Sequence, residues 1–365
     1  MISYSYLRIV YFLLILLYII MSCLSFYSGE LLYRLFAVSV GLIVFISILT
    51  RVKVIYSFGL LIPLVIVLLI GIYNYQWSEF RSIFLVFVFL SCFGISWAAF
   101  EFNLTKFAYE YVFMFFLGLT SVLFFVFGYG PNEFNKFLEG SSRNVYSALL
   151  IASCIGYLIS IHYRHKRPSF LLLSFFVILS FPLYGRTGIF LSLVIFCIAL
   201  LVYRPVPIFV MVAVLLPVSL LFYSYVFFDY VQVLDNTSFV SGLDSSRYQK
   251  WYEYISNLEM SSIVFGLDFT QLPIIHSYGD NPHNAFIRLH GYWGLGVFII
   301  LFIVSISTVY HVLHSNYFFL GIAAVVLFRS FFDIVYFFNL FDYLFFPVLF
   351  YFFYICFFHV KKRSY

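Results

Sequence analysis

The chain has 365 residues, of which 64% are hydrophobic and 24% aromatic, while only 10% carry a charge. Soluble domains carry about 25% charged residues, and one soluble core stops growing at about 250 to 300 residues, so a single large soluble domain is excluded. The formal net charge of +5 comes mostly from short basic clusters and does not require a nucleic-acid partner. We expect one integral membrane domain over residues 1–365.

Apolar runs of about 20 residues predict membrane-spanning helices, because only helices and closed barrels satisfy every backbone group inside lipid. The runs are apolar all round and do not alternate as barrel strands would, so an all-α polytopic protein with about 12 transmembrane helices is expected. In chain order, the expected helices are Tyr6–Tyr27, Leu35–Leu49, Val54–Tyr73, Ile83–Phe100, Phe107–Phe127, Val145–His162, Phe170–Leu183, Ile189–Tyr203, Ile208–Phe228, Tyr292–Val309, Tyr317–Phe338 and Tyr343–Phe358.

Basic clusters predict the orientation of these helices, since short loops rich in Lys and Arg stay in the cytoplasm. Counting helices between the clusters places all of them on one side, so both termini are expected in the cytoplasm. The clusters are Arg51 with Lys53, Arg164 with Lys166 and Arg167, Arg204, and Lys361 with Lys362 and Arg363.

Four arginines fall on the opposite, outward side: Arg143, Arg186, Arg247 and Arg288. A guanidinium presents a planar fork of donors that matches phosphate oxygens and keeps its charge, so a lipid diphosphate is a suitable ligand. The alternative is that each arginine pairs with Asp, Glu or a lipid headgroup.

Residues 229–284 form the one long polar interval, which the helix count places outside the membrane. Within it, Asp244–Ser246 can cap a helix, and the residues that follow recur at three- and four-residue spacing. An amphipathic helix on the outer membrane surface is expected, with either a substrate role for Trp251 or only a packing role as a lid. Its apolar-facing positions are Arg247, Trp251, Tyr254 and Leu258, and Gln249, Lys250, Glu253 and Asn257 take other faces.

The dipeptide Asn281-Pro282 favours an extended turn that presents His283 and Asn284 at the start of the next helix. A histidine there can act as a general base, or it can simply cap the helix. Asp244, Asp268 and Asp280 are rival bases.

Several motifs then occur in a particular order. They are Arg186-Thr187-Gly188, the stretch from Arg247 to Trp251 leading to Phe265-Gly266, and His283-Asn284 followed by Gly291-Tyr292-Trp293-Gly294-Leu295-Gly296. Over residues 143–309 this pattern resembles the bacterial O-antigen polymerase and O-antigen ligase superfamily. Gly185 departs from it, since the family more often has Ser before the arginine.

The resemblance implies a glycosyltransferase of the GT-C type in the bacterial inner membrane, with its large loop in the periplasm. Such enzymes use undecaprenyl-diphosphate-linked oligosaccharides, sometimes with a chain-length regulator protein as partner. The resemblance is consistent with a mechanism in which Arg186 and Arg247, with Arg143 and Arg288, hold the diphosphate. His283 would take the proton of the acceptor hydroxyl as general base or would orient that hydroxyl. Asn284 would position His283 or a sugar, and Trp251 would stack on one.

No metal or other cofactor is expected, because no Asp-x-Asp motif occurs in the outward loops and the five cysteines lie in apolar spans. Polymerase is the leading interpretation, and ligase differs from it only in using lipid A core as acceptor. A 12-helix solute transporter is the alternative from another class. Its best support is Arg329 and Asp333, one turn apart, which are more simply read as a structural pair.

Overall fold

The computed structural model describes residues 4–51, 54–139, 142–183, 186–204 and 246–354. These residues form helices joined by short irregular segments, and no strand occurs among them. The all-α prediction is therefore confirmed for the described part of the chain. The expected helix Ile208–Phe228 and the first part of the long loop, up to Ser245, lie outside the described residues.

Six helices in the described ranges are long and apolar enough to cross a membrane. They are α1 (Tyr4–Ser28), α2 (Leu31–Leu49), α5 (Arg81–Glu101), the continuous helix Lys106–Val126, α8 (Arg143–Tyr163) and α16 (Gly296–Leu313). The helix Lys106–Val126 comprises α6 (Val112–Ser121) between two π-helical segments, η1 (Lys106–Tyr111) and η2 (Val122–Val126). Four further apolar helices are α3 (Val54–Tyr73), α9 (Phe170–Ser180), α10 (Arg186–Tyr203) and α17 (Tyr317–Phe332). This composition is that of a multi-pass membrane protein.

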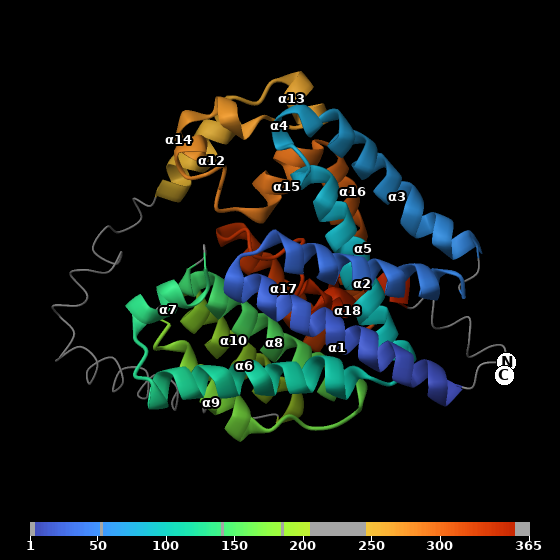
Figure 1. The fold of residues 1–365 in the computed structure, drawn as a ribbon, viewed down its shortest axis with the longest axis vertical. Helices are drawn as coiled ribbons and strands as arrows, with labels where there is room; N and C mark the ends of the chain where they lie inside the picture. The colour runs from blue at the N-terminus through green and yellow to red at the C-terminus, as the bar shows by residue number, and fades with distance from the viewer. Residues whose placement is uncertain (1–3, 52–53, 140–141, 184–185, 205–245, 355–365) are drawn as a thin grey trace.

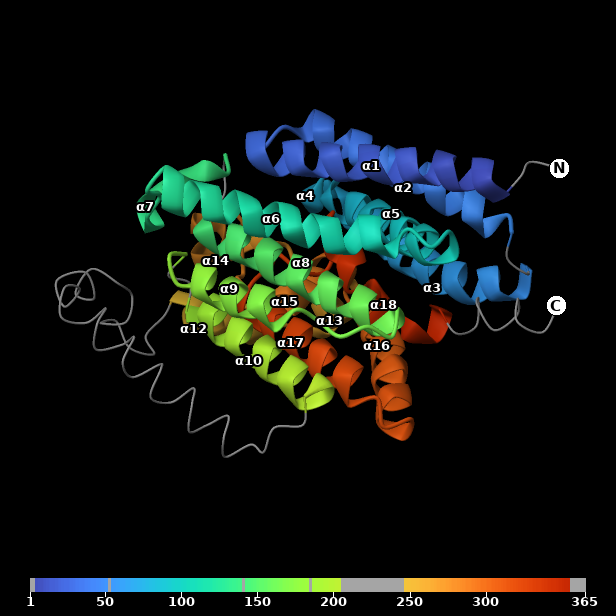
Figure 2. The same ribbon diagram turned by 90° about the horizontal axis from the view of Figure 1, so that it is seen from below.

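α1, α2, the helix Lys106–Val126 and α8 run roughly side by side (Figure 2), and α5 and α8 are the most buried of the long helices. Small residues allow α2 and α5 to approach closely, as is common between helices in lipid. A Cβ on Gly41 would come within 2.5 Å of the Ser91 Cβ, and one on Gly94 within 2.7 Å of the Phe45 Cα. The Ser91 hydroxyl also donates to the Val38 carbonyl at 2.8 Å. A larger residue at either glycine would force the two helices apart.

The basic clusters within the described residues gather at one end of the bundle. The Arg51 guanidinium lies 5.5 Å from the ring of Phe102, just after α5, and Phe100 packs on Tyr163 at the end of α8. From the end of α8, His162 Nδ1 contacts the Tyr203 hydroxyl at 2.9 Å. Arg51, Arg164 and Arg204 therefore share one end, as the helix count predicts.

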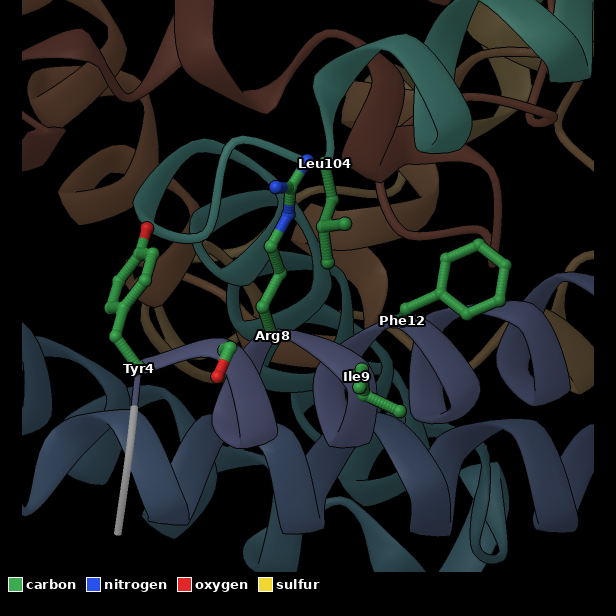
Figure 3. A pocket seen from close by; sticks show the side chains of 6 residues that line it. Tyr4, Arg8, Ile9, Phe12 and Leu104 are labelled. Atoms are coloured by element: carbon green, nitrogen blue, oxygen red, sulfur yellow. The ribbon is translucent and has the colours of Figure 1, made fainter. Parts of the chain in front are cut away.

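A pocket of about 440 Å³ opens at this same end, beside the start of α1 (Figure 3). Its lining residues are Tyr4, Ser5, Arg8, Ile9, Phe12 and Leu104. The Tyr4 hydroxyl donates to the Glu101 carbonyl at 3.2 Å, which ties this pocket to the end of α5. The pocket is lined by the first turns of α1, at the opposite end of this helix from its connection to α2.

Several predicted helices are wrong in their bounds. The helix predicted over Tyr317–Phe338 ends at Phe332, because Asp333 takes an extended conformation and Phe337 has φ +53°. The helix predicted over Tyr292–Val309 is broken at Gly294, which has φ +47°. Such a φ is adopted readily by glycine and ends the preceding helix.

The irregular segment after α17 is buried, so its backbone groups need partners from neighbouring helices. The Tyr18 hydroxyl donates to the Leu340 carbonyl at 2.6 Å, and Tyr109 donates to the Tyr343 carbonyl at 3.0 Å. The predicted helix Tyr343–Phe358 accordingly starts as two short pieces, and its residues after 354 lie outside the described part. The pieces are η4 (Asp342–Leu344) and α18 (Phe346–Leu349).

Short helices form a separate group at the end opposite the basic clusters (Figures 1 and 2). In Figure 1, α12, α13 and α14 lie together above α15, with α13 next to α4 at the end of α3. The group comprises α4 (Tyr75–Ser78), α12 (Ser246–Ser256), α13 (Met260–Phe265), η3 (Phe269–Gln271), α14 (Pro273–Ser277) and α15 (Ala285–Trp293), while α7 (Pro131–Phe137) lies at the same end.

Candidate functional site

Glycines hold the loop helices against α15. Gly266 has φ +100°, and a Cβ there would come within 2.1 Å of the Gly291 carbonyl oxygen. A Cβ on Gly294 would come within 2.0 Å of the Val264 carbonyl oxygen. Only residues without a side chain allow this approach, so glycines that lie far apart in the sequence motifs meet in one contact.

The end of α3 is part of the same contact. The Asn74 side-chain amide is buried and donates to the carbonyls of Phe265 and Tyr292, the latter at 2.8 Å. The Tyr73 ring packs on Phe265 with ring centroids 4.7 Å apart. One amide therefore joins α3, α13 and α15.

The expected amphipathic helix is present as α12, although it ends at Ser256, before Leu258. Trp251 lies against the bundle, where its Nε1 donates to the Pro282 carbonyl at 3.2 Å and its ring lies 6.1 Å from Phe332. The Tyr254 hydroxyl contacts His290 Nδ1 at 2.6 Å. These contacts fix the helix over the end of α17.

Two polar residues of α12 that were predicted to face elsewhere are buried. Lys250 is completely buried and Glu253 is 9% exposed. The Glu253 carboxylate accepts the backbone amides of Ile274 and Ile275 at 2.8 and 2.9 Å, at the start of α14. α14 packs across the side of α12 that carries Lys250 and Glu253, whereas Tyr248, Tyr252 and Ile255 on the remaining surface of the helix stay exposed.

The turn before α15 separates the roles of His283 and Asn284. Asn284 caps the helix, since its buried side-chain oxygen accepts the amides of Phe286 and Ile287 at 2.9 and 3.1 Å. His283 has φ +52°, and its backbone amide donates to Asn281 Oδ1 at 2.8 Å. The structure thus gives the capping role to Asn284 and leaves the His283 ring beside α12.

His283 lies among positive charges. Burial first, and then the charges of Lys250 and Arg247, lower the pKa of His283 to about 4, against the opposing charge of Asp333. Burial also lowers the pKa of Arg247, with Asp333 and Arg329 acting on it in opposite directions. These side chains from α12, α17 and the turn before α15 therefore act on one another electrostatically.

Arg329 and Asp333 form the structural pair expected from their spacing. The Arg329 Nη2 donates to Asp333 Oδ2 at 3.0 Å and to the Asn144 carbonyl at 3.0 Å, and Arg329 is only 3% exposed. The transporter interpretation expected His283 to lie far from the outward arginines. Instead, the pair and His283 both lie within range of Arg247.

Arg288 extends the positive region along α15. Its Nη2 donates to the Phe337 carbonyl, and its Nε is buried without a hydrogen-bond partner. It lies within range of the charges of Asp333 and Asp342, and of Arg34 near the start of α2. We call Arg247, Lys250, Arg288 and Arg329 the cation cluster.

The other two predicted arginines, Arg143 and Arg186, begin helices that adjoin each other, but no side-chain contact links either arginine to the cation cluster in the described part of the structure. Arg143 begins α8, and its backbone amide donates to Asn135 Oδ1 at 3.0 Å, next to the Asn144 carbonyl that binds Arg329. Arg186 begins α10, but its side chain is outside the described part of the structure. A Cβ on Gly188 would come within 2.2 Å of Ser147 Oγ, so the start of α10 adjoins the first turns of α8.

The rival bases are placed elsewhere or not described. Asp268 accepts the Thr270 backbone amide at 2.8 Å, and Asp280 lies 3.4 Å from Arg81 and 2.9 Å from His276. Asp244 lies outside the described residues. Among the residues that are described, no three His, Cys, Asp or Glu side chains converge as a metal site would require.

The charge balance of the site favours an anionic ligand. Against the four cations of the cluster, the described carboxylates that act on them are Asp333 and Asp342. Arginine forks bind phosphate oxygens through two parallel hydrogen bonds, and such contacts are about twice as strong as neutral ones. A diphosphate carries the charge and the acceptor atoms that this arrangement lacks.

Comparison of the chain with protein-family models, curated proteins and solved structures finds no match. The chemistry of the cation cluster and His283 is therefore the basis for assigning a function to the protein.

Proposed function

We propose that the protein is an O-antigen polymerase, which joins undecaprenyl-diphosphate-linked oligosaccharide repeat units into a surface polysaccharide. The observation that carries the proposal is the cation cluster beside His283, on helices that the Asn74 and glycine contacts hold in place. It combines a site for a diphosphate leaving group with a side chain that can accept a proton.

The location of the cluster fits substrates that arrive from the lipid. The basic clusters favour a cytoplasmic location for the end of the bundle at which they gather. The short helices α12–α15 lie at the other end, and Arg247 and Lys250 belong to α12 and Arg288 to α15, so we assign the cation cluster to the periplasmic face of a bacterial inner membrane. Lipid-linked repeat units are presented on that face.

The proposed reaction is a direct displacement at the anomeric carbon of the donor glycan. A hydroxyl of the acceptor repeat unit attacks this carbon, and the bond from the carbon to the diphosphate oxygen breaks. The hydroxyl proton passes to His283, and the bonding electrons leave with the lipid diphosphate. Attack opposite the leaving group inverts the anomeric configuration.

The cluster lowers the barrier by stabilising charge on the leaving group. Negative charge grows on the diphosphate as the bond breaks, and fixed cations in a site of low polarity stabilise it by several kcal/mol. Arg247 and Arg288 have guanidinium groups suited to this contact, whereas Arg329 is held by Asp333 and Asn144. Arg329 therefore serves to position Asp333 and the end of α17.

Binding of the donor also makes His283 a better base. In the structure the pKa of His283 is lowered to about 4, because burial and two neighbouring cations disfavour the imidazolium. A diphosphate beside Lys250 and Arg247 offsets those charges and raises the pKa. The imidazole is then neutral before reaction and more basic when both substrates are present.

Purified protein in lipid nanodiscs, supplied with a lipid-diphosphate-linked repeat unit, tests the proposal. We expect a ladder of products from the parent protein, with Arg247→Ala and His283→Ala yielding single repeats only. Arg81→Ala, which removes an exposed cation at the same end, should retain the ladder. Product only on added lipid A core would assign the chain as a ligase instead. No glycosyl transfer to either acceptor would overturn the proposal.

A further inference from the structure

Lys250 is the most unusual charged residue in the described structure. Its side chain is completely buried, and its ammonium has no hydrogen-bond partner. The ammonium instead lies 3.4 Å from the centroid of the Tyr278 ring. Buried lysines are rare, and they are normally paired with an acid or bound to a ligand.

Lys250 lies beside the other α12 member of the cation cluster, Arg247. It lies one turn after Arg247 on α12, so the two side chains share a face of the helix. It is also within range of His283, whose ring lies 6.4 Å from that of Tyr278. An ammonium has three hydrogen-bond donors, and a ring face satisfies none of them by a conventional hydrogen bond.

We propose that Lys250 is a phosphate-binding residue of the site, whose ammonium lies on the Tyr278 ring in the structure and donates to the diphosphate of the lipid-linked donor when that ligand binds. This inference rests on the proposed function, because it concerns the same diphosphate. It adds a residue that the sequence motifs do not include, and it gives Tyr278 the role of holding a cation until the anion arrives.

The charges around Lys250 predict how ligand binding depends on pH. Burial, and then the charge of Arg247, lower the pKa of Lys250 to about 8. The other titratable groups that face it are His283 and Tyr278, and Asp333 acts on His283 and Arg247 from α17. The protonated ammonium favours an anion, so affinity should fall as the pH rises above about 8.

Binding of a water-soluble short-chain prenyl diphosphate to the full-length protein in nanodiscs tests the proposal without requiring glycosyl transfer. At pH 7, Lys250→Met should weaken binding by about 10- to 100-fold, the loss expected for one charged hydrogen bond. Lys250→Arg should retain most of the affinity. Lys136→Met, the same change at an exposed lysine of α7, is the matched control and should bind as the parent does.

The pH series separates a binding role from a merely structural one. Between about pH 7.5 and pH 9 the parent should lose affinity, whereas Lys250→Arg, which stays protonated, should not. The ligand titrates identically in both experiments, so its own ionisation cancels in the comparison. A folding defect would not remove the pH dependence while preserving affinity at pH 7.

The outcomes distinguish this inference from the proposed function. If Arg247→Ala loses binding while Lys250→Met binds as tightly as the parent, Lys250 is not a phosphate-binding residue, although the site is. Equal pH dependence in the parent and Lys250→Arg would also refute the inference. If the parent protein itself does not bind the prenyl diphosphate, the proposed function fails with it.

Discussion

Removal of the Asp333 carboxylate is expected to leave Arg329 as an uncompensated buried charge. Arg329 is 3% exposed, its Nε has no hydrogen-bond partner, and Asp333 Oδ2 lies 3.0 Å from its Nη2. Breaking a buried ion pair by removing one partner costs about 3 to 5 kcal/mol. Because the Asn144 carbonyl would remain as a partner, Asp333→Ala should destabilise the protein by the lower figure, about 3 kcal/mol.

Unfolding by denaturing detergent in mixed micelles, followed by circular dichroism, measures this free energy. The matched control is Arg81→Ala, which breaks an ion pair whose arginine side chain is 57% exposed, and should change stability by about 0 to 1 kcal/mol. The double variant Arg329→Met/Asp333→Ala removes the buried charge of Arg329 together with its partner and should recover much of the loss. If Asp333→Ala is no less stable than Arg81→Ala, the reasoning about a buried charge is wrong.

Three further changes have defined expectations. Gly266→Ala places a Cβ within 2.1 Å of the Gly291 carbonyl oxygen, so it should lower the thermal stability strongly. Gly279→Ala is the control: an alanine at its φ of +66° costs about 1 to 2 kcal/mol, but no atom lies within 4 Å of the added Cβ, and equal losses in the two variants would contradict the expectation. His283→Ala should slow transfer by about 100- to 10,000-fold. In the parent, kcat/KM should stay level from pH 7 down to about pH 5, since burial and neighbouring cations lower the pKa of the imidazole to about 4, and a loss centred near pH 6.5 would contradict this lowered pKa. Glu253→Gln weakens two hydrogen bonds from the α14 amides and should cost about 1.5 to 3 kcal/mol of local stability. The amides of Ile274 and Ile275 should then exchange hydrogen faster than in the parent, and unchanged exchange rates would contradict this expectation.

Hydrophobic patterning predicted the long helices well because a membrane span leaves a continuous apolar run. The bounds of α1, α5 and α8 agree with the predictions to within a few residues. The pattern failed between Phe332 and Asp342, where the chain stays apolar but is not helical. Apolar residues are equally suited to a helix in lipid and to an irregular segment buried between helices, and only the hydroxyl groups of distant tyrosines distinguish the two.

The candidate site was predictable only in part. The motifs identified Arg247 and His283, which the structure brings within electrostatic range of each other. Lys250 was assigned to the wrong face, although its spacing of three from Arg247 was a usable signal. Arg329 was recognised as a paired residue but not as a neighbour of the site, because its proximity depends on how α12 crosses the end of α17.

The hydrogen bonds of the Asn74 amide limit which segments of this protein can be exchanged with those of another protein. The amide belongs to the first quarter of the chain, and both carbonyls that it binds belong to the last third. A chimaera that exchanges only the large loop between two such proteins would separate these partners. Successful loop grafts should therefore carry the end of α3 along with the transplanted segment.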